Sequence, residues 1–239
     1  MSEISLQDVA RQFEDLIAET ESKVDPVLPD LIANSLIELG VDHANTLRPR
    51  HDLFTTAEDF LPLTLVQRAI PMLNEGDNTR LLRVIGLWGG DAAATLIANE
   101  LKRWVFAEGC LAAIGALRTI GGATAALLLA EIAQNGNDEE AVHALHSVED
   151  IASLYSPEAA EGGSIPPSYV AETAWRRHGS ALGHTPTGKL LTMIEAIAHT
   201  TEASEERRRC AKEVLEATLA GAEAWLLRQE EKIERTHGF

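Results

Sequence analysis

Apolar residues in the middle of the chain recur with a period of about 32 positions. A segment that ends in Trp88-Gly89-Gly90 is followed by an alanine-rich apolar run, and the same order returns around Ile120-Gly121-Gly122. A third, partial copy follows at an offset of 31. The equivalent apolar positions of the three copies are Leu82, Ile114 and Leu145; Ile85, Leu117 and Val148; and Trp88, Ile120 and Ile151. Their spacing predicts one helix per copy, which we expect to end at the glycine pairs because glycine tolerates positive φ.

A second helix is predicted to follow each glycine pair, over Asp91–Arg103 and Ala123–Gln134 in the first two copies. A helix pair with one apolar side cannot bury that side alone, so neighbouring pairs must stack. The sequence therefore predicts an all-α fold, a short α-solenoid with irregular helical caps at both ends. We expect one domain, with an N-terminal cap at 1–76, repeats at 77–151, a loop-rich insertion at 152–188 and C-terminal helices at 189–239.

The two caps show helical patterns without the repeat. Ser5–Glu21 predicts an amphipathic helix with Ser5 and Asp8 as a capping box. A second helix is expected from Pro26 to Leu39, closed by Gly40. Its expected apolar positions are Leu28, Leu31, Ile32, Leu36 and Leu39.

The remaining segments are predicted to be loops, interrupted helices and C-terminal helices. Residues 41–55 predict a loop, and 56–74 a helix interrupted at Pro62 and Pro71. After a predicted turn at 135–138, residues 156–168 have a loop composition. Helices are expected at 169–178, 189–200 and 204–235, with Ser204 capping the last one.

The chain is strongly acidic, with 37 Asp and Glu against 20 Lys and Arg, a formal charge of −17. The excess is largest in residues 1–60, which hold 13 acids and 4 bases. Nucleic-acid binding normally rests on clustered Lys and Arg, so we expect no nucleic-acid partner. A basic protein would be attracted, although an acidic surface also serves solubility alone.

Nothing in the sequence predicts a disulfide framework or a membrane span. Cys110 and Cys210 stand far apart, as expected for thiols in a reducing compartment. The first residues lack the basic and apolar segments of a secretory signal, and the longest apolar run stops at Glu131. We expect a cytoplasmic protein with no membrane partner.

The repeat itself resembles a known family. The period near 32, the Leu-Ile-Gly-type helix ends and the Ala-x-x-x-Leu-Ile-x-x-Leu helices are similar to HEAT-like repeats of the short, phycobilin-lyase type, over about 77–151. The signatures of ankyrin and TPR repeats are absent. The resemblance implies a right-handed superhelix of antiparallel helix pairs, in which the helix before each glycine pair lines the concave side.

This register predicts a row of side chains that point away from the core on the concave side, which we call the concave ladder. Its rungs are Arg80, Arg83 and Leu87; Ala112, Gly115 and Thr119; and His143, His146 and Asp150. Small side chains in the middle rung would leave a shallow groove between a basic rung and a histidine rung. We expect this ladder to contact a partner, the alternative being an ordinary hydrated helix face.

Other candidate chemistry is weak in each case. The segment 183–189 fits the first seven positions of a phosphate-binding loop, but Leu190 replaces the hydroxyl that would hold Mg²⁺ and no strand precedes it. His143 and His146 lack further metal ligands at a fitting spacing. The carboxylates Glu139, Glu140, Glu149 and Asp150 are typical of a solvated face. The run Arg207-Arg208-Arg209 lies among glutamates at helical ion-pair spacing.

These patterns favour a non-catalytic scaffold that binds another protein and needs no cofactor or metal. The specific version is an acidic immunity or inhibitor-type protein for a basic toxin or nuclease. The alternative, implied by the resemblance, is a lyase or chaperone-like protein that handles a bilin or another tetrapyrrole. Aromatic residues, which would line a pigment site, are scarce, and the missing basic face disfavours a HEAT-type DNA glycosylase. The sequence leaves the oligomeric state open.

Overall fold

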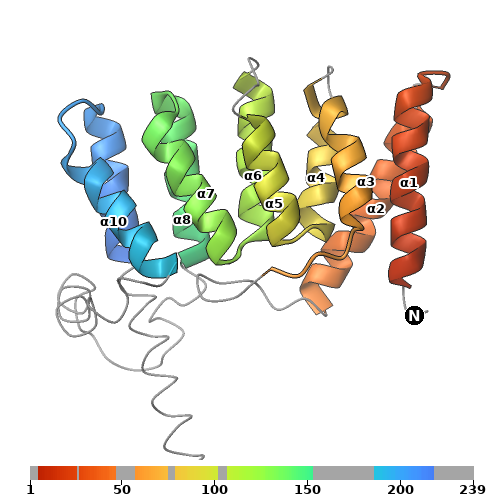
Figure 1. Cartoon of the computed structure of the whole chain (residues 1–239), viewed down its shortest axis with the longest axis horizontal. Coiled ribbons are helices and arrows are strands. Elements are labelled where there is room, and N and C mark those ends of the chain that lie inside the picture. Colours follow the sequence, from red (N-terminus) through yellow and green to blue (C-terminus); the bar gives the residue numbers. More distant parts are fainter. Residues whose placement is uncertain are drawn as a thin grey trace, which may run out of the picture. The chain divides into compact units, whose positions relative to one another are not determined.

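The computed structural model describes residues 5–25, 27–46, 57–74, 79–101, 107–152 and 186–217. Every regular element in these ranges is a helix, which confirms the all-α class for them (Figure 1). The elements are α1 (Leu6–Ser22), α2 (Leu28–Thr46), α3 (Leu63–Ala69), the 3-10 helix η1 (Ile70–Asn74), α4 (Thr79–Trp88), α5 (Asp91–Leu101), α6 (Ala107–Ile120), α7 (Gly122–Asn135), α8 (Asp138–Ala152), α10 (Pro186–His199) and a last helix over 205–217.

The chain divides into two compact units. Unit 1 comprises Met1–His51 and Thr56–Leu128, and unit 2 comprises Asp52–Thr55 and Leu129–Phe239. The boundary falls within α7, inside the predicted repeat block.

Unit 1 is built from two layers of helices. In one layer α2 packs against α4, and α4 packs against α6. In the other layer α1 contacts α3, and α3 contacts α5, while α1·α2 and α5·α6 contacts join the layers. At Gly86 of α4, an added Cβ would lie 3.1 Å from the Ala116 Cα atom of α6. Small residues at this contact allow α4 and α6 to pack backbone against backbone.

The repeat positions form the core, as their period predicts. Leu82, Ile114 and Leu145 are 1%, 2% and 0% exposed. The other two sets of equivalent positions, Ile85 with Leu117 and Val148 and Trp88 with Ile120 and Ile151, are buried as well. Much of the remaining core is alanine, which lets helices approach closely.

The two glycine pairs end their helices for different reasons. Gly121 and Gly122 adopt φ values of 69° and 80°, as expected of a helix stop. Gly89 and Gly90 do not share this conformation, so our expectation of positive φ is wrong for the first pair. A Cβ on Gly90 would lie 2.4 Å from the Ala57 carbonyl oxygen. Close backbone approach is what requires glycine there.

The segment that begins at Ala57 is bonded to this first glycine turn. The Asp59 carboxylate accepts hydrogen bonds from the backbone N–H groups of Gly90 (2.7 Å), Ala92 (3.1 Å) and Ala93 (3.2 Å). Asp59 thereby caps the N-terminus of α5 from a different part of the chain. The Trp88 carbonyl in turn accepts from the N–H of Phe60 at 3.0 Å.

Gly40 does not end the second helix, which corrects our prediction. The helix α2 continues through it to Thr46, into the stretch that we expected to be a loop. A Cβ on Gly40 would lie 2.8 Å from the Trp88 Nε1 atom and 2.9 Å from the Leu87 Cβ atom. The glycine makes room for α4, and the buried Trp88 indole donates to the Leu36 carbonyl at 2.9 Å. Leu31, expected in the buried stripe of α2, is 60% exposed.

The predicted helix caps and breaks are partly confirmed. Ser5 caps α1, but its hydroxyl accepts from Gln7 N–H, and Asp8 pairs with Arg11 instead of completing a capping box. Pro62 precedes α3 rather than interrupting a longer helix. The helix changes to a 3-10 turn where Pro71 lies.

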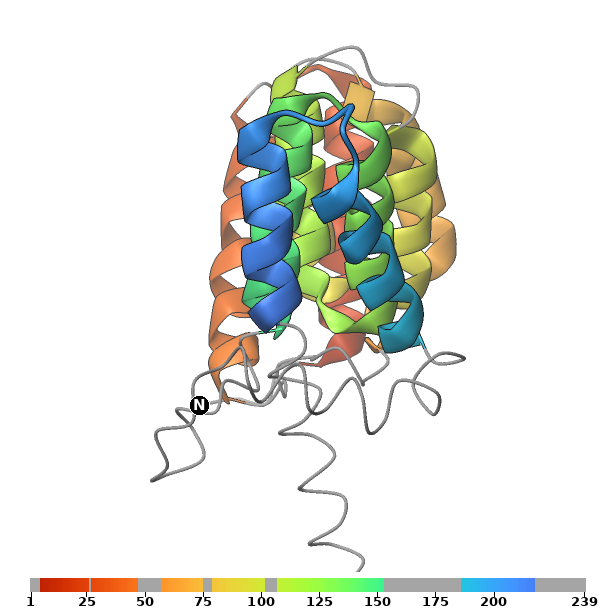
Figure 2. The same cartoon turned by 90° about the vertical axis from the view of Figure 1, so that its left-hand side faces the viewer.

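Unit 2 contains the described part of the chain from Leu129 onward. The predicted turn between α7 and α8 is present, and Asn137 and Glu140 form a reciprocal cap through bonds of 3.0 and 3.2 Å. Figures 1 and 2 show α10 and the last helix lying side by side. Ser204 caps the last helix as predicted, by accepting from Arg207 N–H at 3.2 Å. The predicted loop at 156–168 and helix at 169–178 lie outside the described residues.

Candidate binding face

The basic rung of the concave ladder lies on α4 in unit 1. Arg80 and Arg83 are exposed, as predicted. Leu87 is only 7% exposed, so its predicted outward position is wrong. It packs beside Gly40 of α2, where the missing side chain leaves space for it. The exposed part of the α4 rung is therefore limited to the two arginines.

The two arginines differ in their partners. Arg80 forms an ion pair with Asp30 of α2, which joins the two helices at the surface. Arg83 makes no ion pair with any residue that the structure describes. Its guanidinium keeps its donors available for a carboxylate or a carbonyl of a partner.

The small rung lies on α6, next to α4. Ala112 and Gly115 are partly exposed, and Thr119 is exposed. A Cβ on Gly115 would have no atom within 4 Å, so the surface around it is open. Thr119 donates to the Gly115 carbonyl at 2.9 Å, which uses its hydroxyl proton within the helix. Arg83 and Gly115, which are equivalent repeat positions, thus lie on two helices of the same layer.

The histidine rung lies on α8 in unit 2. His143, His146 and Asp150 are exposed. The His146 Nδ1 atom lies 3.3 Å from a Glu149 carboxylate oxygen. The first two rungs belong to unit 1 and this one to unit 2. The partner contact that we expect of the complete ladder therefore stays a prediction.

The structure brings together a thiol, an imidazole and a carboxylate that sequence analysis missed. Cys210 of the last helix places its Sγ atom 3.9 Å from His146 Nε2, and Glu149 lies at the other ring nitrogen. Burial raises the pKa of the Cys210 thiol, which is 1% exposed. A protonated, buried thiol is a poor nucleophile. No spacing links residues 64 positions apart, so only the fold could reveal this contact.

The run Arg207-Arg208-Arg209, which was predicted to pair with glutamates of its own helix, does so only in part. Arg209 forms the expected ion pair with Glu213, at 3.2 Å. Arg207 instead donates to the carbonyl oxygens of Ala133, Gln134 (2.6 Å) and Gly136 (3.3 Å) at the end of α7. It is a structural cap within unit 2, and only 12% of its side chain is exposed.

Unpaired carboxylates gather on α1 and α2 of unit 1. Glu14, Asp15 and Glu38 are exposed and Glu19 is partly exposed, and none forms an ion pair with another described residue. Glu21 pairs with Arg68, whose guanidinium hydrogen bond holds the pKa of that carboxyl below its usual value. The acidic excess predicted for the N-terminal part is thus a surface property of these two helices.

The described residues contain neither a metal-binding cluster nor a complete phosphate-binding loop. No three His, Cys, Asp or Glu side chains there are grouped so that they could hold a metal ion. Residues 186–189 of the segment that resembles a phosphate-binding loop already form the first turn of α10, and residues 183–185 lie outside the described ranges. Among the described helices, none has both the length and the apolarity needed to cross a bilayer.

Comparison with known proteins identifies no relative. No protein-family model, no curated protein and no solved structure matches this chain.

Proposed function

We propose that this chain is a non-catalytic binding module that holds a basic partner protein. The observation that carries the proposal is the set of exposed carboxylates on α1 and α2 that form no ion pair with a described residue. Exposed carboxylates create a negative field outside the protein, and that field speeds the approach of a positively charged protein. Ion pairs with the partner would then replace solvent at this surface.

The shape that we propose for the module is a short HEAT-like α-solenoid with a right-handed superhelix. Two observations support it in unit 1: α2, α4 and α6 pack in sequence as one layer, and equivalent repeat positions are buried alike. In such a solenoid the α2/α4/α6 layer is the concave side, and Arg83 with its open neighbour Gly115 lies on it. Arg83 would bind a carboxylate or carbonyl of the partner, while α1 and α2 attract its basic groups.

The specific role that we propose is that of an immunity or inhibitor-type protein in the cytoplasm. Such a protein covers a basic toxin or nuclease with its acidic surface, which needs neither a cofactor nor a catalytic group. The buried, protonated Cys210 agrees with this, since it offers no nucleophile. Trp88, one of only 4 tryptophans, is fully buried and cannot line a pigment site.

Capture from the native cell lysate tests the proposal, with bound proteins identified by mass spectrometry. We expect the wild-type chain to retain a basic protein in stoichiometric amount. Reversing charge with Glu14→Lys, Asp15→Lys and Glu38→Lys should lower the association rate at least tenfold and flatten its salt dependence. The matched control is Glu131→Lys with Glu139→Lys and Glu195→Lys, which reverses the same number of exposed charges on α7, α8 and α10.

Two results would count against the proposal. Capture of no basic protein would remove the binding function. The triple variant Glu14→Lys, Asp15→Lys and Glu38→Lys is called the α1/α2 charge variant. Equal loss of binding in this variant and in the control would show that only the net charge of the protein matters. The double variant Arg83→Glu and His146→Ala tests the concave ladder. If the captured partner stays bound to it, the ladder does not contact the partner, and the proposed role of the acidic surface is unaffected.

A further inference from the structure

The turn between α1 and α2, together with the start of α2, exposes four large apolar side chains. Val24, Val27, Leu28 and Leu31 are 84%, 58%, 36% and 60% exposed, and we call them the turn patch. Other exposed large apolar residues in the described ranges, such as Leu6, are separated from this group in the sequence. Single exposed apolar residues are ordinary, whereas a group of them marks an interaction site.

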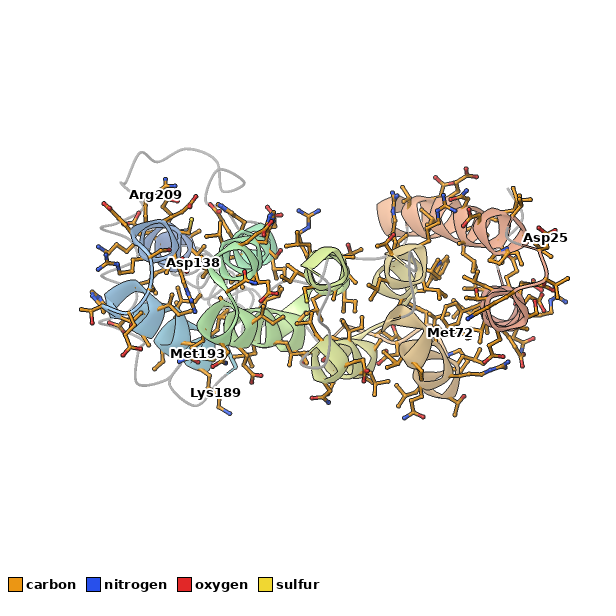
Figure 3. All side chains as sticks on the ribbon, turned by 90° about the horizontal axis from the view of Figure 1, so that it is seen from above. Asp25, Met72, Asp138, Lys189, Met193 and Arg209 are labelled. Carbon is orange, nitrogen blue, oxygen red and sulfur yellow. The ribbon has the colours of Figure 1, made fainter. Side chains whose placement is uncertain are left out.

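Hydrogen bonds position the described residues on both sides of this turn. The Asp25 carboxylate accepts from Val27 N–H at 2.9 Å, and the Val27 carbonyl accepts from Leu31 N–H at 3.1 Å. Val27 and Leu31 therefore lie one helical turn apart on the same face. Lys23, in the left-handed conformation at φ 52°, closes the preceding helix by donating its N–H to Glu19. Figure 3 shows Asp25 at this turn, at the margin of unit 1.

Carboxylates are frequent in the sequence next to the turn patch. Between Glu14 and Leu31 the chain holds six carboxylates and one lysine. Glu21 and Asp30 are paired with arginines of α3 and α4, whereas Glu19 and Asp25 have no ion pair with a described residue. A second copy of this chain would bring like charges together at the patch, and an anionic membrane would be repelled. Charge complementarity favours an occupant that carries apolar side chains between lysines or arginines.

We propose that the turn patch is the apolar centre of a docking site for a basic amphipathic helix of the partner protein. The apolar face of that helix would cover Val27 and Leu31, while its cationic side chains reach Glu19 and Asp25 at the rim. An apolar centre with a charged rim is the usual composition of a specific interface. This inference rests on the proposed function and assigns the place where the partner is held.

Two synthetic helical peptides test it by fluorescence anisotropy with the full chain. Both carry leucines at helical spacing, and their polar faces consist of lysine in one and of glutamate in the other. We expect the wild type to bind the lysine peptide and not the glutamate peptide. Val27→Ser with Leu31→Ser should weaken binding of the lysine peptide at least tenfold. Leu6→Ser with Leu63→Ser, which changes exposed apolar residues elsewhere, should change it less than twofold.

Several outcomes would overturn the inference. Equal binding of the lysine peptide by the wild type and the Val27/Leu31 variant would show that charge alone holds it. A wild-type dimer in sedimentation velocity that the same variant dissociates would identify a second copy as the occupant. A captured partner that stays on the Val27/Leu31 variant but leaves the α1/α2 charge variant would refute the docking site and keep the proposed function. Absence of any basic partner would refute the function itself.

Discussion

Arg207 should contribute more to stability than either arginine that follows it. Its guanidinium donates to three carbonyl oxygens at the end of α7 and lies 3.8 Å from the Asp138 carboxylate. The last carbonyls of a helix have no partner within the helix, and the helix dipole places negative charge there. Replacing Arg207 by alanine removes the donors and the positive charge together.

The expected loss follows from the number and burial of these bonds. Hydrogen bonds to a charged group are worth about 1.5–3 kcal/mol each when measured singly, and they are not additive. The side chain of Arg207 is 12% exposed, so solvent screens it little, but the freed carbonyls at the helix end regain water. We therefore expect Arg207→Ala to lower the free energy of unfolding by about 3 kcal/mol. Arg209→Ala removes an exposed pair on one helix and should cost less than about 0.5 kcal/mol.

Urea unfolding and hydrogen exchange measure the two effects. The midpoint of urea unfolding should fall clearly for Arg207→Ala, with an unchanged slope, and barely for Arg209→Ala. Exchange of the amides in the last turns of α7 should become roughly a hundredfold faster in Arg207→Ala, the rate change that matches about 3 kcal/mol. Similar midpoints for the two variants, or unchanged exchange in α7, would refute the assignment of Arg207 as the cap of α7.

Three further predictions concern other parts of the chain. Gly90→Ala should lower the melting temperature by several degrees because the added Cβ would overlap backbone atoms. Gly115→Ala places its Cβ in open space and should raise the melting temperature slightly. Equal shifts for the two variants would contradict this. Glu21→Gln should destabilise the protein at neutral pH and lose this effect as pH falls below the usual carboxyl pKa of 4.5. Pairing with Arg68 lowers the pKa of Glu21 in the folded state, so the pair stabilises the fold only while the carboxyl is ionised. A difference in urea midpoint that stays constant between pH 3 and 7 would contradict this. The thiol of Cys210 should react with an aromatic disulfide reagent only after unfolding, and fast reaction of the native protein would show that it is accessible.

The sequence predicts local structure well where that structure depends only on residues close together in the chain. The helical spacing around Ile114 and the turn at Gly136 need only contacts within a few positions, and both predictions are confirmed. Gly40 shows where this approach fails. A glycine after an apolar helical run is typical of a helix end, yet here it provides room for the Trp88 side chain from another helix. Leu31 was expected in the core for the same local reason, and it lies in solvent.

Sequence patterns alone are enough to predict the helices, the buried faces of the repeat helices and the acidic character of the N-terminal part. These properties follow from periodicity and composition, which act through near neighbours and can be counted along the chain. Three other features became visible only in the folded chain: Arg207 caps α7, Cys210 contacts His146, and no described helix of unit 1 covers the turn patch. Each of these depends on packing between segments far apart in the chain, and no local pattern encodes that packing.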